Sequence, residues 1–292
     1  MEATTKTPVI KPKKRKSNWS VFAVVNGLIF VIVCLIVIVP LWKVIVDSLD
    51  MTTGYGMKLL PEKFGWDGYA TVLGNPSLQN PLKISVITTI AGTFLGLLLS
   101  TLGAYVLIQW EMPGRTFFAN ALLVTMVFSG GMIPSYIVMR NLGLVNTIWV
   151  VILMPAINVY NLVLMRNFFE GIPNSLFESA TLDGCTPMQT FYKIALPLSK
   201  AALASIGLMF AVAYWNDYTN YKLYITRQNL YNFQMKLRSM MQGSDLPTSN
   251  GAATENTIKN AAVFVAIFPF LIIYPFLQKY FVKGINIGAV KE

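Results

Sequence analysis

The chain has no histidine, two cysteines and few charged residues, which make up 12% of its 292 positions. Without histidine, acid–base or nucleophilic chemistry that depends on an imidazole is excluded. Cys34 lies in an apolar run and Cys185 in a polar loop, so they indicate neither a disulfide framework nor a metal site. A G-x-x-x-x-G-K-[ST] motif is also missing, so the sequence predicts no P-loop nucleotide site in this chain.

Charge is absent from six long apolar runs, and these runs decide the class of protein. The first, Val21 to Val39, would be roughly 28 Å long as a helix, close to the thickness of a bilayer core. We therefore predict an all-α, polytopic membrane protein with six transmembrane helices. Ion-coupled carriers usually place ionisable side chains at mid-membrane, and these runs offer none. The other predicted spans cover approximately 85–108, 117–139, 147–165, 201–216 and 261–278.

Basic side chains gather in residues 1–18, ahead of the first span. This position favours a cytoplasmic N-terminus under the positive-inside rule rather than contact with nucleic acid. With six spans in a transmembrane domain of residues 19–282, the C-terminal tail of residues 283–292 is also expected in the cytoplasm. The lysines and arginines of the other loops favour the opposite orientation, but long outer loops have little weight in this rule.

A polar segment, residues 170–200, separates two apolar runs and carries the clearest local signals in the chain. We call this segment the hook. Ser175 and Glu178 have the spacing of a capping box at the start of a short helix. Gly184 suits the left-handed residue that ends such a helix. We therefore predict that the first of two short helices ends at a hinge formed by Gly184 and Cys185.

The second short helix has its own start signal. Thr186 is placed to cap it, Pro187 to occupy its first position and Gln189 to complete a capping box. The chain is then expected to enter the membrane after Pro197. A polar helical segment between two spans is suited to binding a soluble partner. Six apolar residues recur at helical spacing and would pack either on the protein itself or in the cleft of a partner, namely Leu176, Phe177, Ala180, Met188, Phe191 and Ala195.

The hook also resembles a segment of a known family. The string E-S-A-T-L-D-G at residues 178–184, followed by Leu196-Pro197, matches the E-[SA]-A-x-x-D-G…L-P loop of membrane subunits of ATP-binding-cassette importers. Over nearly its whole length, the chain most closely resembles the smaller, six-span subunit of carbohydrate importers related to the maltose permease. Residues 215–218, 280–284 and 288–291 fit the same subgroup.

The resemblance implies a type I importer permease fold and a set of partners. The chain would form half of a pore with a second permease subunit, and a dimer of cytoplasmic ATPases would hold ATP and Mg²⁺. An extracellular solute-binding protein would deliver a sugar or oligosaccharide. The protein would lie in the bacterial cytoplasmic membrane, surrounded by lipid, with both termini inside. No cofactor, metal or catalytic residue is expected in this chain, and no contact with nucleic acid.

In that family the hook is a coupling helix that docks in a cleft of the ATPase. Helix capping alone is an alternative role for Glu178 and Asp183. The residues that the resemblance assigns to coupling are Glu178, Ala180, Asp183, Gly184, Phe191 and Pro197, with Gly288 and Lys291 of the C-terminal tail as further contacts with the ATPase.

The far end of the fifth predicted span alternates aromatic residues with amides and an acid. Aromatic rings stack on pyranose faces, while amides and carboxylates bind hydroxyl groups, so this mixture suits a sugar. An aromatic belt at the membrane interface is the alternative that composition favours. A helix break predicted at residues 129–136 is a second pathway candidate, since non-helical backbone within a membrane needs protein or water around it. The candidate pathway residues are Tyr136, Trp215, Asn216, Asp217 and Tyr218.

Residues 219–260 form the longest polar stretch and are predicted to be an outer loop with a mobile tip. In the resembled family the corresponding loop contacts the extracellular binding protein. A disordered connector is the alternative. The positions that we expect to contact the binding protein are Gly243, Ser244, Asp245 and Asn250.

Small residues mark two faces for helix packing, Gly92-x-x-x-Gly96 with Gly103, and the stretch 201–207. A second permease is a candidate partner for one of these faces. Two other classes of function stay open for the chain. One is a secondary carrier or channel that works without an ATPase, and the other is a structural or enzymatic membrane protein.

Overall fold

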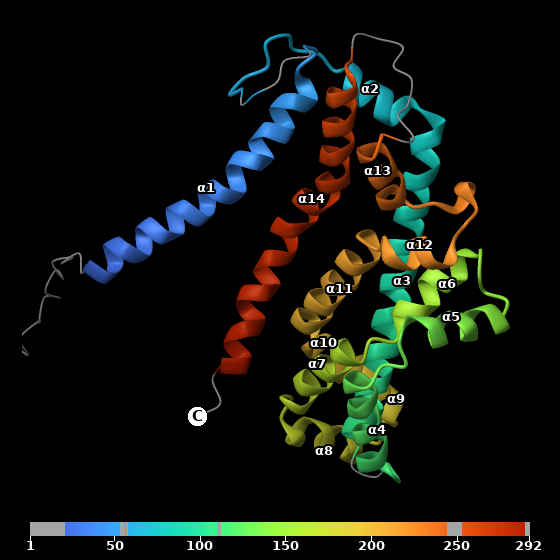
Figure 1. Cartoon of the computed structure of the whole chain (residues 1–292). Coiled ribbons are helices and arrows are strands. Elements are labelled where there is room, and N and C mark those ends of the chain that lie inside the picture. The colour runs from blue at the N-terminus through green and yellow to red at the C-terminus, as the bar shows by residue number, and fades with distance from the viewer. Residues whose placement is uncertain (1–20, 53–55, 57, 110–111, 244–252, 290–292) are drawn as a thin grey trace, which may run out of the picture.

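The computed structural model describes residues 21–52, 56, 58–109, 112–243 and 253–289 (Figure 1). Within these residues the chain is helical and has no β-sheet, and Asp50 and Phe64 form one isolated bridge. The predicted all-α class is therefore confirmed. The basic tail, residues 1–18, lies outside the described residues.

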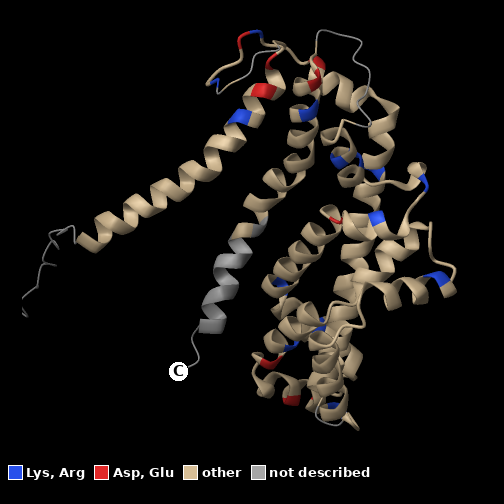
Figure 2. Ribbon diagram, in the orientation of Figure 1, with Lys and Arg blue, Asp and Glu red and all other residues tan. Residues whose placement is uncertain are grey.

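Three helices are long and apolar enough to cross a membrane, α1 (Val21–Leu49), α3 (Pro76–Ile108) and α14 (Glu255–Ala289), the last over Glu255–Phe276. Charged residues lie toward the ends of these helices (Figure 2), as a bilayer core requires. Bent pairs of helices bring the number of candidate spans to six if each pair counts as one span. The pairs combine α4 (Arg115–Val127) with α5 (Met132–Asn141), α6 (Ile148–Ala156) with α7 (Val159–Glu170), and Pro187–Leu198 with α11 (Lys200–Trp215).

The predicted third span is broken, because α4 and α5 are inclined to each other by 115°. The break falls at residues 128–131, where Gly131 has a φ of +88° that side-chain-bearing residues rarely adopt. This position overlaps the helix break predicted at residues 129–136, so that prediction is confirmed.

Elsewhere the helices bend within the predicted spans or extend beyond them. α6 and α7 are bent by 44°, because the side chain of Asn158 accepts the N–H of Asn161 and starts a new helix. α3 begins at Pro76, well before the predicted start, since Asn75 caps it with proline in its first position. α14 continues to Ala289, through most of the predicted C-terminal tail.

α3 is the central helix and packs along α11, α7 and α6. A Cβ atom at Gly92 would lie 2.4 Å from the ring of Tyr214, and one at Gly96 would lie 2.7 Å from the ring of Phe210. From the opposite helix, Gly207 faces Leu97 of α3. Small residues on both predicted faces therefore let larger side chains of a neighbouring helix approach closely within the chain. Close helix packing is confirmed, and neither face needs a second chain as its partner.

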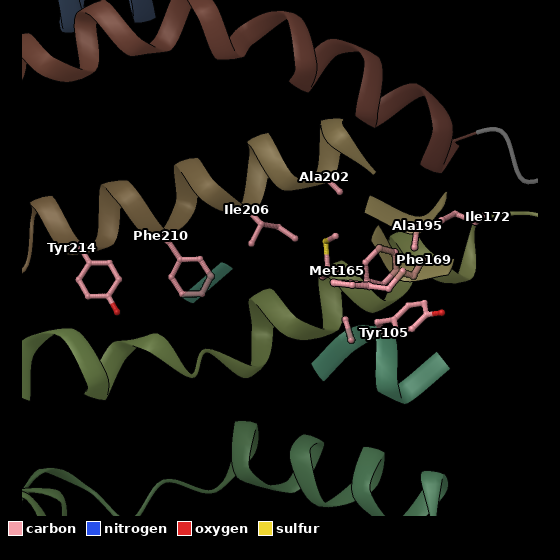
Figure 3. Packing of buried hydrophobic residues seen from close by; sticks show 11 residues of the cluster. Tyr105, Met165, Phe169, Ile172, Ala195, Ala202, Ile206, Phe210 and Tyr214 are labelled. Carbon is pink, nitrogen blue, oxygen red and sulfur yellow. The ribbon is translucent and has the colours of Figure 1, made fainter. Parts of the chain in front are cut away.

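A continuous apolar core runs along α11 toward the hook (Figure 3). Tyr214, Phe210 and Ile206 follow one another along this helix, and Phe169 of α7 and Ala195 lie beyond them at the hook end. All of these side chains are buried. The membrane-spanning helices and the hook thus share one packed core.

α1 diverges from the bundle and approaches α14 near its C-terminal end (Figure 1). Its apolar side chains are largely exposed, and Val46 and Ser48 are its buried residues. Such an all-round apolar helix is suited to a lipid environment.

Asp50 organises the segment that follows α1. Its buried carboxylate accepts hydrogen bonds from Thr52 through both the N–H and the hydroxyl, from the Lys58 ammonium at 2.8 Å and from the Lys63 N–H. The Asp50 carbonyl oxygen accepts a further bond from the hydroxyl of Thr257 in α14. These bonds hold the segment between α1 and α2 (Asp67–Gly74) against the N-terminal end of α14.

The stretch after α11 is not an open loop. Residues 219–243 form α12 (Thr219–Tyr224), the short 3₁₀ helix η2 (Gln228–Leu230) and α13 (Phe233–Met241). Phe233 and Met240 of α13 are buried, because they meet α2, α3 and α14 in a second apolar cluster. The predicted outer loop is thus largely a helical cap on the far end of the bundle.

Candidate coupling and pathway sites

The first half of the hook folds around a glycine hinge, as predicted. Gly184 follows α8 (Asn174–Leu182) with a φ of +76°. The N–H of Gly184 donates to Thr181 O and that of Cys185 to Ala180 O, which is the bond pair of a Schellman motif. A Cβ atom at Gly184 would meet nothing within 4 Å, so the backbone conformation alone favours glycine here.

The second half of the hook begins at α9 (Pro187–Thr190) with the predicted capping box. The Thr186 hydroxyl accepts the Gln189 N–H at 3.3 Å, and the Gln189 side-chain oxygen accepts the Thr186 N–H at 2.9 Å. A π-helical turn, η1 (Phe191–Ala195), and α10 (Leu196–Leu198) then lead to an 81° bend before α11.

The capping box predicted for Ser175 and Glu178 is wrong. α8 begins at Asn174, two residues before the start that an N-cap at Ser175 requires, and no side chain caps it. Pro173 explains the shift, since its φ of −56° already suits a helix and its nitrogen carries no hydrogen to be capped. Ser175 therefore lies inside the first turn, where its carbonyl oxygen accepts the hydroxyl of Ser179.

One side of the hook is anchored to the bundle. The ring of Phe191 is buried and lies 4.9 Å from the ring of Tyr105 in α3. The hydroxyl of Tyr105 donates to the Pro187 carbonyl oxygen at 2.9 Å. Ala180 and Ala195 are buried on the same side. The apolar set was predicted to pack either on the protein or in the cleft of a partner, and Ala180, Phe191 and Ala195 pack on the protein.

The other side of the hook is exposed and partly apolar. Leu182 is 88% exposed and Met188 59% exposed, although both are large hydrophobic side chains. Leu176 shares this exposure. Exposed apolar residues rimmed by polar ones are typical of a surface that binds another protein. Sequence reasoning did not single out Leu182, whose exposure follows from its place at the last turn of α8, opposite buried Ala180.

The two acids of the motif lie on this exposed side. Among the described residues, neither Glu178 nor Asp183 makes an ion pair or caps a helix through its side chain. Asp183 also stands at the C-terminal end of α8, where the helix dipole disfavours a negative charge. Capping and dipole compensation therefore do not account for these acids. Gly184 and Pro197 are exposed beside them.

An ionic cluster joins the start of the hook to α4. Glu170, at the end of α7, accepts Arg166 at 2.9 Å and lies 3.6 Å from the guanidinium of Arg115. Arg115 also donates to the Leu107 carbonyl oxygen of α3 at 2.6 Å. The start of the hook is thus tied to α4 and, through Arg115, to α3.

At the far end of α11, Trp215 is a packing residue. It is 4% exposed, its indole N–H donates to the Ala266 carbonyl oxygen at 2.9 Å, and its ring contacts Phe270. Both its face and its polar group are therefore used within this conformation. Trp215 positions α14 against α11.

Asn216 is exposed beside Trp215 and belongs to a cavity. The Gln234 amide donates to its side-chain oxygen at 3.2 Å, and both amides line a cavity of about 510 Å³ between α11, α13 and α14. The remaining walls are largely apolar, with Leu237 and Phe270 among them. An apolar cleft with two amides at its rim has the composition of a small-molecule site.

The remaining pathway candidates lie on the other side of α11. Burial raises the pKa of the Asp217 carboxyl, which accepts bonds from the N–H and amide of Asn220. The Arg238 guanidinium lies 4.5 Å from the ring centre of Tyr218, in a cation–π arrangement. Tyr136 of α5 stacks on Tyr224 at 5.9 Å. Tyr136 and Tyr218 are partly buried and Tyr224 is fully buried, and none of these rings lines the cavity of Asn216.

Several predicted positions fall at the edges of the described residues. Gly243 ends α13 with a φ of +78°, and Gly288 lies within α14. Within the described part of the chain, no cluster of His, Cys, Asp and Glu could hold a metal ion. Ser244, Asp245, Asn250 and Lys291 lie outside the described residues.

Bent spans around a central helix, with a polar hook between two of them, define an inner-membrane transport permease of the type I importer fold. The family described as binding-protein-dependent transport system inner membrane component matches residues 114–287. The chain belongs to this family, and it is a transmembrane subunit of an ATP-binding-cassette importer.

Similar proteins match nearly the whole chain. Protein LplC of Bacillus subtilis is 39% identical over 93% of this chain and 95% of its own length. The polygalacturonan/rhamnogalacturonan transport system permease protein YtcP of the same organism is 38% identical over 90% and 95%. The crystal structure of a bacterial transporter that imports the acidic polysaccharide alginate is similar with a TM-score of 0.85 and 28% identity, over 92% of this chain and 99% of that one.

Proposed function

We propose that the chain is one of two permease subunits in a carbohydrate importer, and that its hook docks on a separate cytoplasmic ATPase. The observation that carries this proposal is the two-sided hook. Phe191 and Tyr105 fix one side to the bundle, while Leu182 and Met188 are exposed on the other. A rigid mount with an exposed apolar tip is suited to transmitting the movement of a soluble partner.

The proposed substrate is an oligosaccharide cut from a polysaccharide. YtcP is named for polygalacturonan and rhamnogalacturonan transport, and the similar crystal structure belongs to an alginate importer. An extracellular binding protein would deliver the sugar to the far end of the bundle. Asn216 and Gln234 line the cavity of about 510 Å³ between α11, α13 and α14 and are the proposed contacts for the hydroxyl groups of the sugar.

In the proposed cycle this chain binds no nucleotide and catalyses no reaction. ATP and Mg²⁺ are held by a dimer of ATPase subunits, whose closure moves the hook. Because the hook and α11 share the core shown in Figure 3, a displacement at Phe191 is carried to the helix that ends at Trp215. The spans then alternate between inward-open and outward-open arrangements as rigid bodies. Both chain ends face the cytoplasm in this arrangement.

Reconstituted transport tests the proposal. The chain would be co-expressed with a second permease, an ATPase and a binding protein from the same organism, and the complex placed in proteoliposomes. We expect uptake of labelled oligosaccharides only when ATP is supplied on the hook side and the binding protein on the other. Uptake by the chain alone, without ATPase, would instead identify a secondary carrier or channel.

A further inference from the structure

A second cavity opens at the far end of the bundle, apart from the one that contains Asn216. Its volume is about 230 Å³, below the ~300–1,000 Å³ of pockets that enclose drug-sized ligands. It therefore fits one sugar unit rather than a whole oligosaccharide. Its polar and aromatic lining comes from the first turns of α3 and the turn between α12 and α13, and consists of Ser77, Asn80, Gln228, Asn229, Tyr231 and Lys236.

The walls of this cavity are held in place by hydrogen bonds between distant parts of the chain. The Asn80 amide donates to the Asn229 carbonyl oxygen at 2.8 Å, joining α3 to the turn. Asn232, which is 1% exposed, donates to the Asp217 carbonyl oxygen and caps α13. The Phe233 N–H donates to the Ser85 hydroxyl of α3 at 2.8 Å. The cavity is thus formed before any ligand enters, which limits the entropic cost of binding.

The surroundings of the cavity are basic. Residues 225–243 contain Arg227, Lys236 and Arg238 and no Asp or Glu. Lys83 lies one turn after Asn80 on α3, and within the described residues neither Lys83 nor Arg227 makes an ion pair. Both are exposed.

Two acids elsewhere at this end of the molecule are, by contrast, paired with lysines, whereas Asp217 is bonded to Asn220. Asp47 pairs with Lys43 at 2.8 Å, and Glu255 pairs with Lys259. Figure 2 shows the basic residues of α3, α12 and α13 on the side of the bundle opposite α1. The cavity therefore lies in a field that attracts anions, and such a field raises the local concentration of an anionic substrate.

The lining also has the groups that a sugar ring needs. The Tyr231 ring offers a stacking surface, the amides of Asn80 and Gln228 offer both donors and acceptors, and Lys236 adds a cation. A protein-docking surface would instead have an apolar core with charges confined to its rim. The concave, polar shape of this cavity favours a saccharide that carries a carboxylate.

We propose that this cavity is a subsite for a hexuronate unit, so that the substrates of the importer are acidic oligosaccharides. The inference rests on the proposed function and gives the chemical class of its substrate. The carboxylate of the sugar would lie toward Lys236 and Arg227, and its ring against Tyr231. Neutral oligosaccharides of the same length would gain nothing from these cations.

The test compares two probes in the complete reconstituted transporter, trigalacturonate and its fully methyl-esterified form, which has the same skeleton without charge. The ratio of their uptake rates is measured for the wild type and for the double variant Arg227→Gln/Lys236→Gln. Because exposed ion pairs contribute modestly, we expect the acid-to-ester ratio to fall by about threefold to tenfold in the variant. The effect should shrink as salt is raised from low ionic strength. Any preference of the binding protein itself cancels between the two ratios.

The matched control is Lys43→Gln/Lys259→Gln, which removes the same charge from two lysines that do not line the cavity. Its ratio should equal that of the wild type. Equal loss of both probes in the Arg227/Lys236 variant would overturn the proposal and assign the basic residues to the binding protein. Uptake of maltotriose without uptake of trigalacturonate would also overturn it, yet would leave the proposed function standing. Absence of ATP-driven uptake for any saccharide would count against the proposed function itself.

Discussion

The hydroxyl of Tyr105 donates a 2.9 Å hydrogen bond to the carbonyl oxygen of Pro187, joining the hook end of α3 to the first residue of α9. The two residues are far apart in sequence, and the bond lies beside the contact between the rings of Tyr105 and Phe191. α3 and the second half of the hook are therefore expected to move as one unit.

Removing that hydroxyl tests the unit directly. In Tyr105→Phe the ring contact with Phe191 stays, but the Pro187 carbonyl loses a partner, at a cost of about 1 kcal/mol. We expect faster hydrogen exchange at residues 186–191 and lower coupled uptake, with normal amounts in the membrane. Tyr192→Phe is the control, because Tyr192 is 49% exposed. Unchanged exchange in Tyr105→Phe would show that the bond contributes nothing to the hook.

Gly184→Val should disturb the hinge without affecting membrane insertion. A β-branched residue at a φ of +76° costs about 1–2 kcal/mol, so α8 would turn relative to α9. We expect weaker association with the ATPase and loss of uptake. Asp183→Lys should act in the same direction by reversing charge at the docking edge. Membrane levels, ATPase co-purification and uptake would be measured together.

The chain contains a matched control for this hinge. Gly143 ends α5 in a second Schellman motif, with a φ of +68° and bonds from Gly143 to Arg140 and from Leu144 to Met139. Gly143→Val brings the same backbone strain in the turn after α5, away from the hook (Figure 1). We expect this variant to co-purify with the ATPase as the wild type does. Wild-type ATPase binding and uptake in both Gly184→Val and Asp183→Lys would make the hook a simple connector.

Gly92→Ala should destabilise the bundle. The added Cβ would lie 2.4 Å from the Tyr214 ring, and that ring cannot retreat freely because its hydroxyl donates to the Ile152 carbonyl oxygen at 2.7 Å. Overpacking of this kind costs about 1–3 kcal/mol, to be seen as a lower unfolding temperature in detergent. Gly27→Ala, with nothing within 4 Å, should not lower it. Equal unfolding temperatures for the two variants would contradict the close approach of α3 and α11.

The ionised Asp50 carboxylate should make the stability of the folded chain depend on pH. Burial raises the pKa of its carboxyl, but the hydrogen bonds from Lys58, Thr52 and Lys63 outweigh burial and hold the pKa well below its usual range. The stabilisation by ionised Asp50 is therefore complete above the unfolded pKa of about 3.9 and is lost as pH falls toward the lower folded value. Asp50→Asn should unfold at lower temperature than the wild type at pH 7.

For Asp50→Asn the difference from the wild type should narrow as the pH is lowered below about 4, the ordinary range of the carboxyl. Asp47→Asn, which removes an acid with one surface lysine partner, should have a smaller effect at every pH. A difference that stays constant down to acid pH would show that the charge of Asp50 is not what holds the segment.

The parts of this architecture that could be predicted were those with local causes. Gly184 and the Thr186 box depend on a few neighbouring residues, and both were found where the sequence placed them. The capping box predicted at Ser175 was wrong, because Pro173 takes the N-cap position and α8 begins at Asn174. The burial of Phe191 depends on α3, a helix distant in sequence, so spacing alone left open whether this side chain packs on the protein or on a partner.

The structure of residues 219–243 was harder to predict for the same reason. Its polar composition predicted a loop, but Phe233 and Met240 are buried by helices from three other parts of the chain. The cavity that contains Lys236 likewise forms only where α3 meets the turn after α12. The residues that line this cavity come from two parts of the chain, 76–81 and 228–236, so no local sequence pattern could indicate it.

Site-specific photo-crosslinking tests the central claim, that the exposed side of the hook binds the ATPase. A benzophenone amino acid would replace Leu182, which is 88% exposed, or Leu142, which follows α5 away from the hook (Figure 1) and is 63% exposed. The variants would be assembled with the other subunits in membranes and irradiated. We expect an adduct with the ATPase from position 182 and none from position 142. An ATPase adduct at position 142, or none at position 182 in a transporter that still imports sugar, would contradict the account.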